Sequence, residues 1–338
     1  MHRLPRLRLA TPLLAAAALA ALSTVQGAIV ATATEPTTLV TPDRASLEEL
    51  LRERTVTPTG QVRRFDLEVR TTEWELLPGV ATEAVTFNGT VPGPTIRVTE
   101  GDSVEVVVTN SLDEPTAVHW HGIHVPNAMD GVAGVTQPAI EPGESFTYRW
   151  TCPQRAAAGA WLIHDGGPAA SSSMALGALA VVIIRAPGEQ RPDLPASPVR
   201  QPGDTATHFA AVPAPPKRGE YVLLFHELPG VGLCLNGRQG LGNTPTLVAG
   251  IGTRMAIHCL NAASYPITVH MDGHRWQRGD RWVDVELLPA GGGATLSLLS
   301  GSAENGGGPG EWLLTGTAGA GQVAGSLLVT AGGAVSLA

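Results

Sequence analysis

Residues 116–124 read Thr-Ala-Val-His-Trp-His-Gly-Ile-His, with three histidines in the last six positions. The apolar and β-branched character of the segment predicts a strand over residues 117–122. Side chains two positions apart leave a strand on the same face, so His119 and His121 are expected to point to one side. Imidazoles presented in this way suit copper or zinc, whereas two hydrogen-bonded surface histidines are the alternative interpretation.

Short segments with β-type composition flank this stretch on both sides. Turn signals such as Glu100-Gly101-Asp102 and Glu141-Pro142-Gly143 separate them. The 338 residues include 40 Gly and 27 Pro with only 15% charged residues, which is typical of a loop-rich all-β protein. Many short strands at this spacing predict a β-sandwich or barrel. The predicted strands are residues 64–69, 84–87, 95–98, 104–109, 117–122, 145–151, 159–164 and 177–184, followed by further strands from residue 220 onward.

The region around the histidine pair resembles the multicopper oxidase family. The resemblance rests on collinear segments that are typical of this family: Phe87 to Ile96 (FNGTVPGPTI), Glu100 to Asp102, Asn110 to Leu112, His119 to Gly122, Val132 to Gln137, Pro142-Gly143 and Ser145 to Trp150. The segments Leu235–Arg238, Arg254–Asn261 and Val269–Trp276 resemble the second cupredoxin domain of the same family. The resemblance implies an all-β fold of two cupredoxin-like Greek-key barrels or sandwiches, related by a weak internal repeat.

The composition along the chain predicts five parts. Residues 1–33 read as a secretory leader, because a basic start at residues 2–8 precedes an apolar, Ala-rich run at residues 9–22; an uncleaved anchor is the alternative. Residues 34–60 are predicted to be a linker with one short helical pattern at 47–51. Residues 61–186 form the first predicted cupredoxin-like domain, residues 187–218 a Pro-rich linker, and residues 219–338 the second domain.

Charge and cysteine content restrict the partners. The formal net charge of −8 and the absence of a basic patch argue against nucleic-acid binding, and no segment after the leader is long and apolar enough to span a membrane. The leader predicts a secreted, periplasmic or cell-envelope protein. Three cysteines, Cys152, Cys234 and Cys259, allow one disulfide and a spare thiol, but the sequence does not pair them.

The family resemblance implies copper ligands at defined positions, and four of them are kept. A multicopper oxidase has a blue site with one Cys and two His, and a trinuclear cluster with eight His in four His-x-His pairs. By resemblance, His119 and His121 are the first pair, His164 remains from the second and His270 from the third. His119 and His270 correspond to the ligands of the lone type-2 copper.

The remaining ligand positions are replaced. By resemblance, Gly166 replaces the histidine that would pair with His164. Ile267 replaces a blue-copper histidine, and Asp272 replaces the histidine that would pair with His270. In the last block, Trp312-Leu-Leu is followed by Thr315, Gly316 and Thr317, then Gly321 and Ser326, so that the cysteine is lost with the other ligands. Without a thiolate no blue-copper electron entry is expected.

These residues predict an exported protein of this family that has no blue site and no laccase-type oxidase activity. Its four histidines His119, His121, His164 and His270 are expected to bind one type-2-like copper, with zinc as the other candidate metal. In two-domain relatives the cluster forms between subunits of a homotrimer, which would bring His270 from a neighbouring chain. The alternatives are a metal-free cupredoxin scaffold that binds a protein or envelope partner, and an active copper-dependent oxidoreductase.

Overall fold

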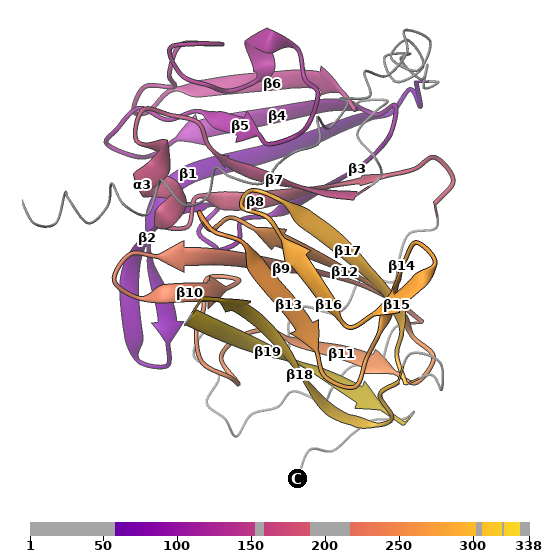
Figure 1. Cartoon of the computed structure of the whole chain (residues 1–338). Coiled ribbons are helices and arrows are strands. Elements are labelled where there is room, and N and C mark those ends of the chain that lie inside the picture. Colours follow the sequence, from indigo (N-terminus) through magenta and orange to yellow (C-terminus); the bar gives the residue numbers. More distant parts are fainter. Residues whose placement is uncertain (1–57, 153–158, 190–216, 302–305, 320, 332–338) are drawn as a thin grey trace, which may run out of the picture. The chain divides into compact units, whose positions relative to one another are not determined.

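The computed structural model describes residues 58–152, 159–189, 217–301, 306–319 and 321–331. The predicted leader, the helical pattern at 47–51 and most of both predicted linkers lie outside these residues. The described residues belong to one compact unit, Glu53–Ala338. They contain many strands in several sheets and only one short α-helix, α3 (Ala170–Ala175), so the all-β expectation is confirmed (Figure 1).

The first barrel consists of two four-stranded sheets packed around one core. In Ser103–Asn110 one side chain in two is buried, whereas all side chains of Leu179–Arg185, which lies between the two barrels, are buried. Buried Trp120, Tyr148, Val106 and Ile163 lie between the two sheets. One sheet has the order β2-β1-β4-β6 and the other β3-β8-β7-β5, with the bounds β1 (Val62–Leu77), β2 (Val80–Phe87), β3 (Thr95–Thr99), β4 (Ser103–Asn110), β5 (Val118–Trp120), β6 (Ser145–Thr151), β7 (Gly159–Asp165) and β8 (Leu179–Arg185).

The second barrel repeats this plan. A four-stranded sheet of order β10-β9-β12-β17 packs on a five-stranded sheet of order β11-β19-β18-β13-β16, and a small hairpin, β14 (Trp276–Arg278) with β15 (Arg281–Val283), is attached. The bounds of the other strands are β9 (Arg218–Leu228), β10 (Gly232–Leu235), β11 (Thr246–Gly250), β12 (Arg254–Asn261), β13 (Ile267–Met271), β16 (Val285–Leu288), β17 (Gly293–Leu299), β18 (Gly310–Ala318) and β19 (Gly321–Thr330). In both barrels the first strand runs parallel to a later one, β1 with β4 and β9 with β12.

Matching turns confirm that the two barrels are an internal repeat. Asn88 and Asn236 both adopt a positive φ, of 55° and 49°, before a glycine. Buried Asn110 ends β4, and its side chain donates hydrogen bonds to the carbonyls of residues 114 and 140. Buried Asn261 ends β12 and donates in the same way to the carbonyls of residues 265 and 288. The repeat that is weak in sequence is therefore clear in the hydrogen bonds that hold the turns.

The two barrels contact each other through an apolar layer with a cluster of charges beside it. Leu162, Leu179 and Val181 of the first barrel pack on Leu224 and Leu260 of the second. Nearby, the Glu220 carboxylate contacts Arg185 at 2.5 Å and Arg97 at 2.8 Å, which joins β9 to β8 and β3. Burial by itself raises the pKa of Glu220, but the nearby His258 and the hydrogen bonds from Arg97 and Arg185 lower it to about 2. This buried, fully paired carboxylate joins the two barrels.

The long hairpin β1–β2 adds a second connection. The Trp74 indole nitrogen donates a hydrogen bond to the carbonyl of Gly237 at 2.7 Å, and the guanidinium of Arg238 lies over the Trp74 ring at 4.9 Å from its centroid. The side chain of Asn243 donates to the carbonyl of Leu76 at 2.7 Å. The tip of this hairpin is therefore fixed to the second barrel.

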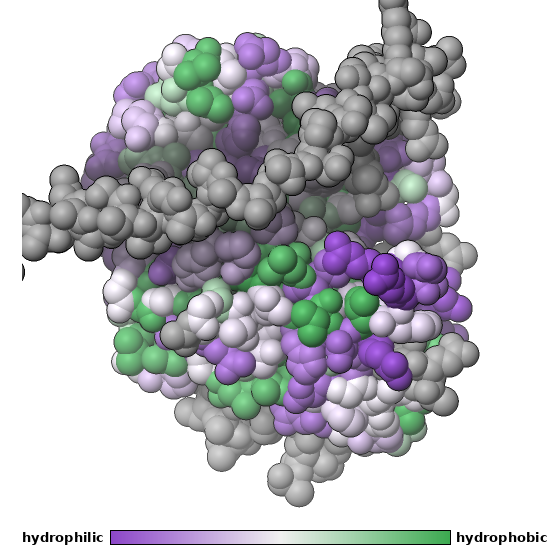
Figure 2. Space-filling model, in the orientation of Figure 1, coloured by the Kyte–Doolittle hydropathy of each residue, from purple (hydrophilic) through white to green (hydrophobic). Residues whose placement is uncertain are grey.

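The outer surface mixes polar and apolar side chains (Figure 2), and the edge strand β16 exposes Val285 and Leu287. Among the described residues, no helix is long and apolar enough to cross a membrane. Cys152, Cys234 and Cys259 are all buried free thiols, so the disulfide that the sequence allowed is not formed. The boundaries of the two expected domains stay predictions.

Candidate metal centre

Three histidines of the first barrel meet because of strand register. His119 lies on β5 directly opposite His164 on the antiparallel strand β7. His121 directly follows β5. Its backbone N–H donates to the carbonyl of Leu162, which continues the β5–β7 register. Buried Val118 and Trp120 point into the barrel core, so the alternating imidazoles leave the opposite face of the sheet. The expected common face of His119 and His121 is confirmed, and His164 shares it.

The three side chains can offer one ligand atom each, with all three atoms within 4.8 Å of one another. The ring centroids of His119 and His164 are 5.0 Å apart, those of His121 and His164 5.6 Å, and those of His119 and His121 6.0 Å. Two nitrogens that bind one ion at about 2.0–2.1 Å lie no more than about 4 Å apart. At most a small rotation of the rings therefore brings all three nitrogens onto a single ion.

Backbone carbonyls fix the tautomers of two of the rings. The Nδ1 atom of His119 lies 2.7 Å from the carbonyl of Asp130, and the Nδ1 atom of His164 lies 2.8 Å from the carbonyl of Asp165. A carbonyl only accepts, so each Nδ1 carries the proton and donates it. In the neutral form of each ring, the Nε2 atom then presents a lone pair. This arrangement, a metal ligand held by a hydrogen bond through its other nitrogen, is common around bound metals.

Burial keeps the site ready for a cation. Desolvation lowers the pKa of His164, with smaller effects from its imidazole neighbours, although the hydrogen bond to the Asp165 carbonyl raises it. Desolvation and the charge of His119 lower the pKa of His121. Both rings therefore stay neutral at pH 7, and a neutral imidazole is the form that binds metal. Three converging imidazoles, of which burial keeps His121 and His164 neutral, fit a copper or zinc ion.

Part of the chain is similar in sequence to known copper proteins. Residues 68–189 match the family model described as "Multicopper oxidase". This part of the chain is therefore similar in sequence to multicopper oxidases. The multicopper oxidase MmcO of Mycobacterium tuberculosis is 45% identical over 102 residues, which cover 29% of this chain and 18% of that protein. Copper resistance protein A of Escherichia coli is 40% identical over 94 residues, which cover 28% of this chain and 15% of that protein.

Solved structures extend the similarity of fold to both barrels. The blue copper oxidase of Nitrosomonas europaea aligns over 80% of this chain and 86% of its own, with a TM-score of 0.60 and 22% identity. The copper nitrite reductase of the same organism aligns over 80% and 94%, with a TM-score of 0.61. The matches to the curated relatives span about a fifth of their length or less. The expected cupredoxin-like fold is thereby confirmed, and the relatives with similar sequences are named as multicopper oxidases and copper resistance proteins.

Residue 166, where the multicopper oxidase pattern has a histidine, has no room for a side chain because backbone atoms lie against it. A Cβ atom on Gly166 would lie 2.0 Å from the carbonyl oxygen of Gly131 and 3.2 Å from the Cβ of His119. The loop that contains Gly131 is itself pressed onto β5, because a Cβ there would lie 1.7 Å from the carbonyl oxygen of Val118. The space that a histidine at residue 166 would need is therefore filled by Gly131.

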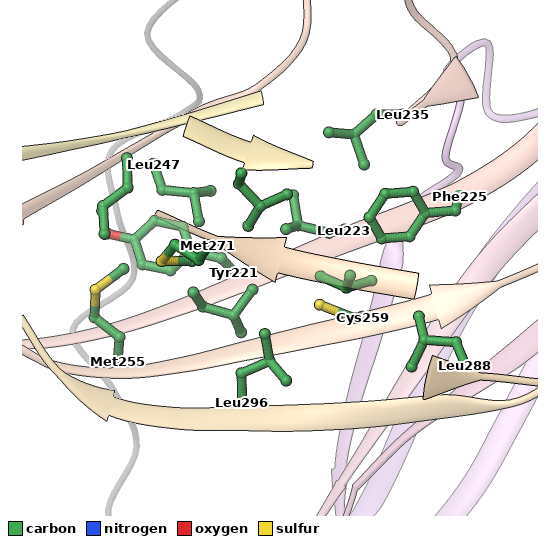
Figure 3. Packing of buried hydrophobic residues seen from close by; sticks show 14 of the residues in the cluster. Tyr221, Leu223, Phe225, Leu235, Leu247, Met255, Cys259, Met271, Leu288 and Leu296 are labelled. Atoms are coloured by element: carbon green, nitrogen blue, oxygen red, sulfur yellow. The ribbon is translucent and has the colours of Figure 1, made fainter. Parts of the chain in front are cut away.

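The multicopper oxidase positions for the blue site lie in the apolar interior of the second barrel. A Cβ atom on Gly316, the expected cysteine position, would lie 2.3 Å from Cε1 of Phe225. Phe225 and Ile267, which stands at a blue-site histidine position, are both completely buried. Figure 3 shows Phe225 with Leu223, Leu235 and other apolar side chains of this core. Carbon side chains fill the volume that the ligands of a blue site would occupy.

His270 does not join the other three histidines within one chain. It lies on β13 of the second barrel and its side chain is 37% exposed. Its Nδ1 atom is 3.2 Å from the carboxylate of Asp272, and its Nε2 atom is 3.9 Å from that of Asp284. Three of the four predicted ligands therefore converge, and His270 is engaged by carboxylates of its own barrel.

The other histidines that the structure describes are buried in structural roles or exposed. His226 and His274 are buried; His226 accepts a hydrogen bond from the backbone of Gly237, and burial lowers its pKa to about 4. His258 is buried beside Glu220, and His124 is exposed. His208 lies outside the described residues.

Sequence reasoning overlooked one contribution to the site, the carbonyl of Asp130. Asp130 belongs to the segment Met129-Asp130-Gly131, which is not among the predicted ligands. In the structure this turn holds His119 by the hydrogen bond described above, and the Asp130 carboxylate lies 3.7 Å from the same Nδ1 atom. The Met-Asp-Gly turn that follows the histidine pair was the available signal.

Proposed function

We propose that this protein is an exported copper-binding member of the multicopper oxidase superfamily in which His119, His121 and His164 bind a single copper ion, and in which laccase-type oxidase activity is lost. The convergence of three imidazoles on one sheet face carries this proposal. The apolar filling at residue 316 supports the loss of the blue site, because thiolate coordination is what makes electron entry from a substrate possible there.

The chain's own residues would act as follows. The Nε2 atoms of His119 and His164 face the ion while their Nδ1 protons stay on the carbonyls of Asp130 and Asp165. Burial keeps protons off His121 and His164, so the site accepts a cation near neutral pH. Copper bound in this way would supply a one-electron redox couple. Alternatively, the site would only sequester the metal. Zinc fits the same donors.

His270 and the subunit assembly form a separate part of the proposal. Since His270 lies outside the cluster of His119, His121 and His164 in its own chain, it could add a fourth imidazole only from another copy of the chain, as in the homotrimer implied by the resemblance. Sedimentation of the purified protein tests this directly. A monomer, with or without copper, would contradict a site shared between subunits.

The decisive experiment measures metal in protein purified without chelator. We expect about one copper or zinc per chain, tightly bound in wild type and in His124→Ala, which removes an exposed histidine of the same segment. The triple variant His119→Ala, His121→Ala and His164→Ala should bind none. Wild-type protein with far less than stoichiometric metal would contradict the proposal and favour the metal-free scaffold that binds a protein or envelope partner.

A second measurement separates the proposed function from an active oxidoreductase. With added copper, we expect no oxidation of a phenolic dye above the level of the triple variant. Efficient turnover that depends on the three histidines would contradict the proposed loss of oxidase activity. It would not contradict the proposed metal site.

A further inference from the structure

A turn of the second barrel lies directly against one of the three imidazoles. Gly291, between β16 and β17, has no side chain, and a Cβ built on it would lie 3.1 Å from Nε2 and 3.3 Å from Cε1 of His121. These distances are tighter than ordinary van der Waals contact, so any side chain at this position would push on the tip of the His121 ring. The site formed by the first barrel is therefore covered on one side by the second.

The covering turn is held firmly. Asn261 is completely buried, and its side chain donates hydrogen bonds to the carbonyls of Leu288 and Pro289. The backbone N–H of Gly291 donates to the carbonyl of Asn261 at 3.0 Å, and the N–H of Asn261 donates to the carbonyl of Gly292 at 2.8 Å. Because these bonds fix the turn from both sides, it cannot retreat easily from a larger side chain at residue 291.

The first barrel contains the same turn without an imidazole against it. The N–H of Gly143 donates to the carbonyl of Asn110 at 2.8 Å, as that of Gly291 does to Asn261. The φ angles are +78° for Gly143 and +70° for Gly291, so both turns need glycine for their backbone alone. Nothing lies within 4 Å of a Cβ on Gly143. The two positions thus carry the same backbone strain on substitution and differ in their steric surroundings.

We propose that Gly291 is a positioning residue of the metal site: because it has no side chain, it leaves room at the tip of the His121 ring, and this imidazole can turn onto the ion that His119 and His164 would hold. This inference rests on the proposed function. It makes the second barrel part of the site even though all three converging ligands come from the first. A side chain at residue 291 would displace His121 and leave an ion with two nitrogens.

The matched pair Gly291→Leu and Gly143→Leu tests the proposal with copper. Both variants carry the strain of a positive φ, so their difference isolates the contact with His121. We expect Gly291→Leu to bind copper at least about tenfold more weakly than Gly143→Leu, in the range seen when a residue that orients a ligand is lost. Nitrogen superhyperfine structure in the electron paramagnetic resonance spectrum should show one nitrogen fewer in Gly291→Leu alone.

A second readout needs no metal. Diethyl pyrocarbonate modifies accessible neutral imidazoles, and peptide mapping of the metal-free proteins locates the modified ring. We expect reduced modification of His121 in Gly291→Leu, relative to wild type and Gly143→Leu, with both variants folded by circular dichroism. Equal modification of His121 in the two variants, or equal copper binding, overturns this inference. Failure of the wild-type protein to bind copper instead overturns the proposed function, and the modification result still decides on the contact.

Discussion

Restoring the histidine that the family pattern places at residue 166 should damage the protein instead of rebuilding a cluster. In Gly166→His, the new Cβ would begin 2.0 Å from the carbonyl oxygen of Gly131, so one of the two backbones must move by more than 1 Å to reach ordinary contact. The Gly131 loop cannot move inward because it already lies on the carbonyl of Val118. It must lift away from β5, and the neighbouring carbonyl of Asp130 would leave His119 with it.

The cost can be estimated from these contacts. Overpacking a well-filled region costs about 1–3 kcal/mol, and loss of the hydrogen bond from His119 adds about 1 kcal/mol. We therefore expect the free energy of unfolding to fall by about 2–4 kcal/mol. Urea denaturation of the metal-free protein measures this value. Gly308→His is the matched control, because a Cβ at the exposed Gly308 meets nothing within 4 Å.

The metal content of the same variant completes the test. With His119 released from its carbonyl, we expect copper to bind more weakly than in wild type, and never at more than one ion per chain. Isothermal titration with copper measures both quantities. A variant as stable as Gly308→His that takes up a second copper would refute the reasoning, because it would mean that the space beside His164 opens without cost.

Three further predictions concern the packing around the site. Gly316→Cys should give no intense blue absorption band with copper, because the ring of Phe225 occupies the space of the new side chain. A strong band would contradict this, because it would mean that the core rearranges to admit the thiolate and the metal. Glu220, whose pKa is lowered from 4.5 to about 2, should contribute about 3 kcal/mol of stability above the pKa it has when unfolded, and this contribution is lost as pH falls toward 2. Urea unfolding from pH 7 to pH 3 should therefore show the stability of wild type approaching that of Glu220→Gln; parallel curves would contradict this. Asn261→Ala and Asn110→Ala should each lower the free energy of unfolding by about 1–3 kcal/mol, since each leaves buried carbonyls unpaired, and thermal unfolding that changes for only one of them would contradict the equivalence of the two turns.

Much of the fold could be predicted from the alternation of apolar and polar residues along the strands and from the turn residues between them. The expected strands at residues 64–69, 104–109 and 145–151 all lie within β1, β4 and β6, because one face of each is buried and the other is not. The repeat between barrels was only weakly visible, since it resides in two asparagines, Asn110 and Asn261, whose bonds to distant carbonyls no local pattern reveals. The leader and the linkers stay predictions.

The site was predicted in part, and the missing part has a physical reason. The common face of His119 and His121 follows from the two-residue period of a strand, which is a local property of the backbone. His164 was expected nearby only through the family resemblance, and its place opposite His119 is a matter of β5–β7 register. The expectation that His270 joins them from a neighbouring chain stays a prediction; in its own chain His270 lies beside Asp272 and Asp284 of the second barrel.

The sequence by itself determined the all-β class, the strands and the histidine pair, because these depend on neighbours along the chain and on the alternation of side chains. Tertiary structure alone decided that a carbonyl fills the space beside Gly166, that Phe225 fills the space beside Gly316, and that Gly291 faces His121. Each of these contacts joins residues that are distant in sequence. Whether a vacated ligand position stays open or is filled depends on the volume that neighbouring segments occupy, and that volume is fixed only when the sheets pack.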